Sequence, residues 1–303
     1  MAHCRVRRAA VVRPRKQVTV QRWLLFAIFT TVSWGIWGAF IEIPEKAGFP
    51  ATLGYVVWAL TMVPCALVAL RVAKWKLEHD GRSMVLGSLV GLLGAGGQLL
   101  LFEALRTGPA FIVFPVVALY PVLTIVLSAL LLAERASRRH WSGILLALPA
   151  IALLSYVAPG DAIVKDYSWL PLATLVFIMW GIQAYVMKFA TRTTSAEGIF
   201  FYMMATAVAL IPVAAWMTDF GRSINWGLKG PCLAALVQVL NSAGALCLVY
   251  AMRYGKAIIV APMTALSPVI TVVLSLAVYS RVPPPYQVAG IAIAAIAIYL
   301  MAE

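Results

Sequence analysis

Acidic residues and histidines are scarce in this 303-residue chain, which holds 11 Asp and Glu and 3 His. The histidines, His3, His79 and His140, all fall in segments predicted to lie at the inner side of the membrane, so no histidine-based triad or metal site can form at membrane depth. The glycine-rich run GLLGAGGQ lacks the Lys-Ser/Thr of a phosphate loop. These absences argue against an enzyme, and the sequence predicts no cofactor and no metal ion.

Cysteines are also few, and they share no spacing typical of a metal or redox site. They are Cys4, Cys65, Cys232 and Cys247. We expect those inside apolar runs to pack as small apolar groups.

Charged residues make up only 12% of the chain, against 63% hydrophobic residues and a mean hydropathy of +0.92. A soluble domain does not have this composition. Apolar runs near 20 residues, the length that crosses about 30 Å of hydrocarbon as a helix, occur at 23–42, 51–71, 83–104, 109–132, 139–157, 169–188, 197–217, 230–252, 256–279 and 285–302. The sequence therefore predicts an all-α membrane protein with ten transmembrane helices.

The segment 104–128 returns 147 residues later as 251–275, and the two agree at 15 of 25 positions. An offset of half the chain indicates a tandem duplication. Five is an odd number, so two consecutive five-helix halves enter the membrane from opposite sides. We expect inverted repeats at 23–157 and 169–302, after a basic arm at 1–22.

Lysine and arginine fall mainly on one side of this topology. With the amino terminus inside, the inner segments hold 18 basic residues and the outer loops hold six. Because cytoplasmic loops retain positive charge, we expect both termini in the cytoplasm and the protein in the cell or inner membrane. The net charge of +13 then reflects topology and contact with anionic lipid, and the sequence predicts no nucleic-acid partner.

Several sequence features occur at matching positions in both halves, and together they are typical of a known protein family. Each half has a Trp-Gly pair in its first span, at 34–35 and 180–181, a third span ending Ala-Leu/Met-Arg-x-Gly, and a central proline in its fourth span. Glu134 follows the fourth span, and Gly143 matches Gly290. The chain resembles the drug/metabolite transporter superfamily in its EamA-type branch over 23–302, although Arg281 stands where a second Glu would match Glu134.

The resemblance implies a carrier of small metabolites such as amino acids, nucleobases or sugars, frequently an exporter. Inverted helical repeats suit such a carrier, because exchange of conformation between the halves exposes one site to each side in turn. We therefore expect a secondary transporter that works by alternating access, as a monomer or homodimer. A lipid scramblase or structural membrane protein is the alternative, and a membrane-embedded enzyme is a further rival.

Three tryptophans lie deeper than the headgroup level where tryptophan normally sits. Trp34 and Trp37 share one face of the first span, and Trp180 and Gln183 share the equivalent face of the sixth. Aromatic rings beside a few polar groups are typical of a metabolite pocket. The alternative interpretation is close interhelical packing beside the neighbouring glycines.

Amides at membrane depth are the second indication of a site, because hydrocarbon leaves them without hydrogen-bond partners. Gln98 lies in the third span, and Gln238 and Asn241 lie in the eighth. Thr264 in the ninth span is a further candidate. We expect these side chains to contact substrate or, alternatively, to bond neighbouring helices.

Two prolines at equal spacing occur in each half, Pro115 with Pro121 and Pro262 with Pro268. Each removes a backbone donor and bends or breaks its helix, so we expect hinges. Kinks without a functional role are the alternative.

Few carboxylates lie within the spans. Glu42 and Glu103 are candidate carriers of a coupling proton, but both lie near span ends. Snorkelling or a local pair, such as Glu103 with Arg106, is the favoured account.

Overall fold

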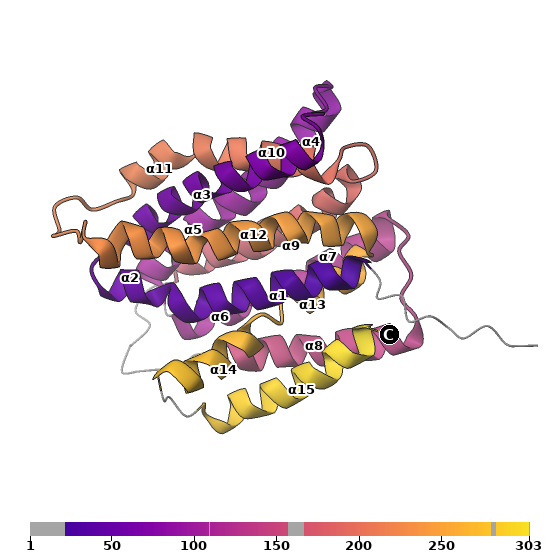
Figure 1. Ribbon diagram of the computed structural model, residues 1–303. Helices are drawn as coiled ribbons and strands as arrows, with labels where there is room; N and C mark the ends of the chain where they lie inside the picture. Colours follow the sequence, from indigo (N-terminus) through magenta and orange to yellow (C-terminus); the bar gives the residue numbers. More distant parts are fainter. Residues whose placement is uncertain (1–21, 109, 157–166, 280–282, 303) are drawn as a thin grey trace, which may run out of the picture.

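The computed structural model describes residues 22–108, 110–156, 167–279 and 283–302, and its regular elements there are all helical (Figure 1). The first half contains α1 (Arg22–Phe40), α2 (Glu42–Lys46), α3 (Ala51–Val72), α4 (Gly81–Gly91), the π-helical turn η1 (Leu92–Gly96), α5 (Gly97–Thr107), α6 (Ala110–Ala118), α7 (Tyr120–Leu131) and α8 (Arg138–Ser155). The second half contains α9 (Trp169–Ala190), α10 (Ala196–Ala209), α11 (Ile211–Trp216), the π-helical turn η2 (Leu228–Cys232), α12 (Leu233–Tyr254), α13 (Ala257–Thr264), α14 (Pro268–Tyr279) and α15 (Pro285–Ala302).

Nine stretches of the described residues are long and apolar enough to cross a membrane. The predicted fifth span corresponds to α8, whose 18 residues begin with Arg138, Arg139 and His140 and are therefore less apolar than the rest. Even so, α8 lies alongside α15, the matching helix of the second half (Figure 1). The prediction of an all-helical membrane protein built from two duplicated halves is confirmed.

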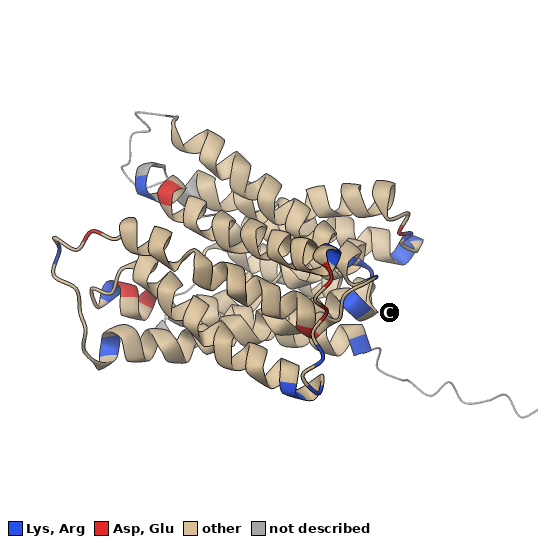
Figure 2. Ribbon diagram, turned by 90° about the horizontal axis from the view of Figure 1, so that it is seen from above, with Lys and Arg blue, Asp and Glu red and all other residues tan. Residues whose placement is uncertain are grey.

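The two halves are inverted relative to each other. Trp23, at the start of α1, and Ala302, at the end of α15, line the same cavity, so the first and last described helices meet at one end of the bundle. We call this the terminal end. Lys188, near the end of α9, lines that cavity too, so α9 finishes where its equivalent α1 starts. Charged residues gather at the two ends and leave the middle of the bundle nearly uncharged (Figure 2).

The fourth and ninth spans are each broken into two helices. α6 ends before Leu119 and α7 starts at Tyr120, whereas α13 ends at Thr264 and α14 starts at Pro268. Both breaks immediately precede the second proline of the pair, because a proline at the start of a helix has no N–H to donate to the preceding turn. The prolines thus lie at or inside these broken helices, and their role as hinges stays a prediction.

Glycines bring the first span of each half against the fourth span of the other half. A Cβ at Gly35 would lie 2.3 Å from the Cβ of Ile270, and a Cβ at Gly181 would lie 2.7 Å from the Cβ of Leu123. The hydroxyl of Thr271 donates to the Gly35 carbonyl over 2.9 Å, and its repeat equivalent Thr124 donates to the Gly181 carbonyl over 3.0 Å. The halves are therefore joined by two matching contacts.

This packing predicts that Gly35→Ala destabilises the protein whereas Gly54→Ala does not. Both glycines lie in helices, so both substitutions to alanine bring the same gain in helix propensity. A Cβ at Gly54, however, meets only the Gln238 amide nitrogen, at 3.8 Å. Overpacking at Gly35 costs about 1–3 kcal/mol. Thermal unfolding of the two purified variants measures the difference, and equal midpoints would contradict the close packing described for α1.

Candidate functional site

Two tryptophans make the same contact across the two halves. The indole Nε1 of Trp34 in α1 donates to the backbone carbonyl of Asn241 in α12 over 3.2 Å. The Nε1 of Trp180 in α9 donates to the carbonyl of Gly94 in η1 over 3.3 Å. Gly94 and Asn241 are 147 residues apart, so the bonds are repeat equivalents. Each indole joins its own half to the other, and its single donor is already engaged.

The π-helical turn η1 lies within the third span, inside the glycine-rich run, and supplies the carbonyl that Trp180 bonds. The equivalent part of the eighth span is uninterrupted α-helix in α12. Such single π turns within α-helices are frequent at functional sites. The two halves therefore differ in backbone conformation at the carbonyl that accepts the hydrogen bond from the tryptophan of the other half.

Trp37, Gln238 and Asn241 form one hydrogen-bonded group. The Gln238 Oε1 accepts from the Trp37 indole at 2.9 Å and from the Asn241 amide at 3.3 Å. The Gln238 Nε2 donates to the Gly54 carbonyl over 3.1 Å. Gln238 is buried with both ends of its amide engaged, so it fixes α1, α3 and α12 relative to one another.

The other two candidate amides have no described hydrogen-bond partner. Gln98 in α5 and Gln183 in α9 are both half-buried. The Gln183 side chain lies over Gly94, where an added Cβ would come within 2.2 Å of its amide nitrogen. In the adjacent turn, Gly97 lies against the Trp180 indole. A Cβ added at Gly97 would lie 2.6 Å from the indole Nε1. The structure thus places Trp180 and Gln183 against the glycines that precede Gln98.

Thr264 lies apart from the amides but is linked to Trp180 through Tyr120. The Thr264 hydroxyl donates to the carbonyl of Val260 at 3.0 Å, and its side chain also contacts Tyr120. The Tyr120 ring meets the Trp180 ring edge-on, with centroids 6.0 Å apart. Sequence reasoning passed over Tyr120, although an aromatic residue at a helix break beside Pro121 is a usable signal.

A second residue that the sequence reasoning passed over is Trp58 in α3. Its Nε1 is buried and has no hydrogen-bond partner in the part of the chain that the structure describes, whereas buried donors are nearly always paired. The backbone carbonyl of Trp58 accepts from Thr61 at 2.8 Å, and the Thr61 hydroxyl bonds Ser242, the neighbour of Asn241. Trp58 therefore places an uncommitted donor near the Gln238 group.

The candidate proton carriers both form local ion pairs at the end opposite the terminal end. Glu42 pairs with Lys46, and both side chains are more than half exposed. Glu103 accepts from the Nε of Arg106 over 2.9 Å, and that arginine is also mostly exposed. This arrangement matches the local pairing favoured for Glu103.

A buried ion pair joins the two halves at the terminal end. Lys188 in α9 lies 4.0 Å from the Glu134 carboxylate, with side chains 19% and 9% exposed. The Lys188 ammonium donates to the carbonyls of Met252, at 2.8 Å, and Gly255, where α12 ends. Glu134 accepts from the backbone N–H of Ile258 at 3.0 Å, at the start of α13. A cation at a helix carboxyl end and an anion at an amino end both have favourable dipole interactions.

A capping contact orders the neighbouring loop at the same end. The Asp80 carboxylate accepts from the Ser83 hydroxyl at 2.7 Å and from its backbone N–H at 2.9 Å. These bonds hold the pKa of the Asp80 carboxyl below its usual range. Because a lowered carboxyl pKa adds stability that is lost only as pH falls through that pKa, the cap persists at neutral pH.

Comparisons with known proteins agree with this architecture. The sequence profile of the EamA-like transporter family matches the chain twice, over residues 21–156 and 167–302. No curated protein matches the chain, but 29 chains of solved structures do. One of these, a crystal structure whose name states no activity, is 17% identical over 93% of this chain and 96% of its own, with a TM-score of 0.76. That likeness shows a shared fold. Within the described ranges, no three His, Cys, Asp or Glu side chains are grouped to hold a metal ion.

Proposed function

Because the chain belongs to the EamA-like transporter family, we propose that it is a secondary transporter that moves a small metabolite by alternating access, in the direction of export. Membership of the family makes it a multi-pass membrane transporter with a small-molecule substrate, and not an enzyme. The mechanism, the class of substrate and the direction belong to the proposal.

The matched contacts between the halves are the observation that carries the proposal. Trp34 and Trp180 cross from one half to the other by equivalent hydrogen bonds. Inverted halves joined by equivalent contacts can exchange conformations, and a site between them then faces each side in turn. In the present structure the halves differ, since only the first has a π-helical turn at this contact.

Uncommitted polar groups support a substrate site between the third and sixth spans. The Gln183 amide lies against Gly94 and the Trp180 ring lies against Gly97, the residue before Gln98. Neither amide has a described hydrogen-bond partner, and Tyr120 extends the aromatic surface from Trp180 toward Thr264. The Trp58 indole, in the second span, is a further donor with no partner among the described residues. Amides and aromatic rings together suit a small molecule with polar edges and an apolar or planar body, which fits the amino acid, nucleobase or sugar classes.

Trp34, Trp37, Gln238 and Asn241 then have a different role in the proposal. Their donors and the Gln238 acceptor are engaged within the protein, so they shape and hold one wall of the site. The side-chain Oδ1 of Asn241 has no described hydrogen-bond partner, so it remains for a ligand. Glu42 and Glu103 are each engaged in a local ion pair, with Lys46 and Arg106. These pairs give no support to a proton-carrying role for either glutamate.

Charge distribution supports an orientation with the terminal end in the cytoplasm of a cell or inner membrane. The terminal end carries most of the basic residues of the spans and loops, and cytoplasmic segments retain positive charge. A reporter that matures only in the cytoplasm, fused after residue 303, is expected to be active; an inactive reporter on a folded fusion would reverse the orientation.

A ligand screen by thermal unfolding tests the proposed function. A metabolite that binds only the folded protein raises its apparent stability by about 2.7 kcal/mol at a hundredfold excess over the dissociation constant. We expect one class among amino acids, nucleobases and sugars to raise the midpoint, and Gln98→Ala to lose the shift. No shift with any class, together with exchange of dye-labelled lipid between leaflets of proteoliposomes, would favour a scramblase instead.

A further inference from the structure

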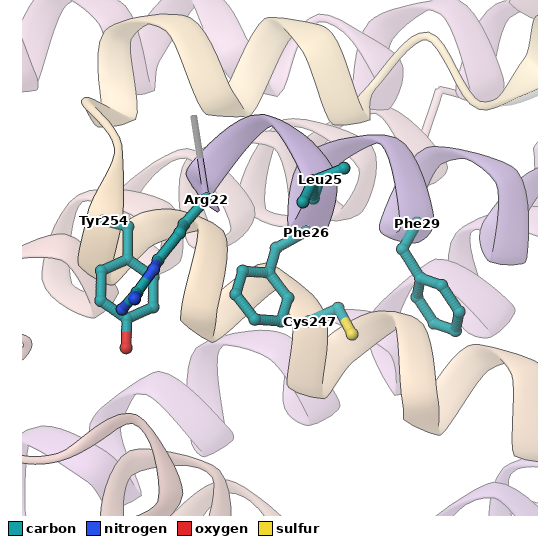
Figure 3. A pocket seen from close by; sticks show the side chains of 6 residues that line it. All are labelled: Arg22, Leu25, Phe26, Phe29, Cys247 and Tyr254. Carbon is teal, nitrogen blue, oxygen red and sulfur yellow. The ribbon is translucent and has the colours of Figure 1, made fainter. Parts of the chain in front are cut away.

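A groove runs along the outer surface of the bundle between α1 and α12. It has a volume of about 510 Å³ and is lined by Arg22, Leu25, Phe26, Phe29, Cys247 and Tyr254 (Figure 3). Leu25 is 56% exposed and Phe29 is 48% exposed, so the groove opens toward the surrounding lipid. It lies away from the candidate substrate site, because none of the eight predicted site residues lines it.

An aromatic stack makes the floor of the groove rigid. The Phe26 ring lies 4.9 Å from the Tyr250 ring at an interplanar angle of 19° and 6.0 Å from the Tyr254 ring at 18°. The Tyr250 hydroxyl donates to a Glu197 carboxylate oxygen over 2.6 Å, which anchors the stack to α10. A preformed surface loses little conformational entropy when a ligand binds.

The groove is amphipathic along its length. Arg22 and Tyr254 lie at the terminal end, Phe26 and Cys247 lie in the middle, and Phe29 lies furthest from that end (Figure 3). Arg22 and Phe29 are seven positions apart, which corresponds to about 10 Å along the helix axis. Among the described residues, neither the Arg22 guanidinium nor the Tyr254 hydroxyl has a hydrogen-bond partner. A cation and a donor thus meet the headgroup region while the rest of the groove meets acyl chains.

We propose that this groove binds one anionic phospholipid, whose phosphate contacts Arg22 and Tyr254 and whose acyl chain lies over Phe26, Cys247 and Phe29. Charge complementarity selects an anionic headgroup over a zwitterionic one, since basic pockets between membrane helices bind such headgroups. The arginine also offers paired donors to phosphate oxygens. Six further basic residues precede Arg22 in the sequence.

Native mass spectrometry of the full-length protein in detergent tests the headgroup contact. The protein is offered equal amounts of phosphatidylglycerol and phosphatidylcholine with identical acyl chains. We expect about fivefold more bound phosphatidylglycerol, since one basic residue adds about 1 kcal/mol of attraction. Arg22→Gln is expected to bring the two lipids to parity, whereas Arg71→Gln, at an exposed arginine of α3 outside the groove, keeps the preference.

Equal binding of both lipids by the unaltered protein would overturn the proposal, and so would an equal loss of preference in Arg22→Gln and Arg71→Gln. Cys247→Phe fills the middle of the groove and is expected to reduce retention of both lipids, with Cys232→Phe, at an exposed site, as its control. Unchanged retention in Cys247→Phe would contradict the acyl-chain contact. If Cys247→Phe does not fold, the two arginine variants decide the matter alone. Inorganic phosphate at the same concentration should not displace the lipid if the acyl chain contributes.

Discussion

Replacement of Lys188 by methionine is expected to open the terminal end of the protein. The substitution removes the ammonium that bonds the last carbonyls of α12 and leaves the Glu134 carboxylate, only 9% exposed, without its cation. Loss of one partner from a buried ion pair costs about 3 kcal/mol at the low end of measured values, and the 4.0 Å separation favours that end. Because the ion pair joins the two halves, its loss destabilises the conformation in which the terminal end is closed, relative to a conformation in which that end is open.

A cysteine probe measures the opening. Ile259 lines the terminal-end cavity and is only 4% exposed, so Ile259→Cys, in a background without the native cysteines, reports access from that side. Labelling by an impermeant maleimide should be at least tenfold and up to about a hundredfold faster with Lys188→Met, since every 1.4 kcal/mol changes a population about tenfold. Lys188→Arg should restore slow labelling.

The matched control for this prediction is Lys229→Met, at an exposed lysine near the opposite end of the bundle. It should label as slowly as the parent. If Lys188→Met labels no faster than Lys229→Met and both unfold at the parent's temperature, the ion pair does not hold this end closed. Faster labelling combined with loss of cooperative unfolding would show damage to the fold and would also count against a closure role.

Truncation of Gln183 to alanine is expected to weaken transport without weakening the fold. The Gln183 amide has no hydrogen-bond partner among the described residues, so its removal leaves no polar group there unpaired, and this common cause of a large loss of stability does not apply. A hydrogen bond to substrate contributes about 1 kcal/mol or somewhat more. Because 1.4 kcal/mol changes a binding constant tenfold, we expect the half-saturating concentration to rise about fivefold to tenfold. The unfolding midpoint should be unchanged.

Gln238→Ala is the informative contrast, because the same chemical change removes engaged bonds. Trp37 and Asn241 each lose an acceptor, and the Gly54 carbonyl loses a donor. Buried groups left without partners cost about 1–3 kcal/mol each, so this variant should unfold at a lower temperature. If Gln183→Ala behaves like Gln238→Ala, the separation of contact amides from structural amides is wrong.

The sequence was sufficient for the architecture because lipid leaves few alternatives. Apolar runs of about 20 residues must form helices in hydrocarbon, and the 147-residue repeat then fixes the inversion. The fifth span shows where composition alone is weaker. α8 begins with two arginines and a histidine, which place its start at the headgroup level, and its partner α15 is the clearer of the two helices by composition.

Residue identity could not separate contacts with substrate from contacts between helices. Trp34 and Trp180 looked alike in sequence and are alike in structure, each bonded to a backbone carbonyl of the other half. Gln183 and Gln238 also looked alike, but only Gln238 has partners for its amide. The difference depends on which carbonyls lie within 3.5 Å after folding, and no local pattern encodes that.

Lys188 gives the clearest example of a role that only the fold reveals. In the sequence it is a lone cation near a span end, where snorkelling is the ordinary account. In the structure its ammonium lies under the end of α12 and beside Glu134, 54 residues away in the chain. The glutamate was part of the family resemblance, but its partner could not be named before the helices were placed.

Counterflow in proteoliposomes tests the central claim most directly. Vesicles loaded with an unlabelled metabolite identified by the thermal screen are diluted into a trace of the same labelled metabolite. A carrier whose single site faces each side in turn must accumulate label transiently above equilibrium, and we expect this with the unaltered protein and less of it with Gln183→Ala. Label that only equilibrates, at a rate independent of the internal metabolite, would contradict alternating access.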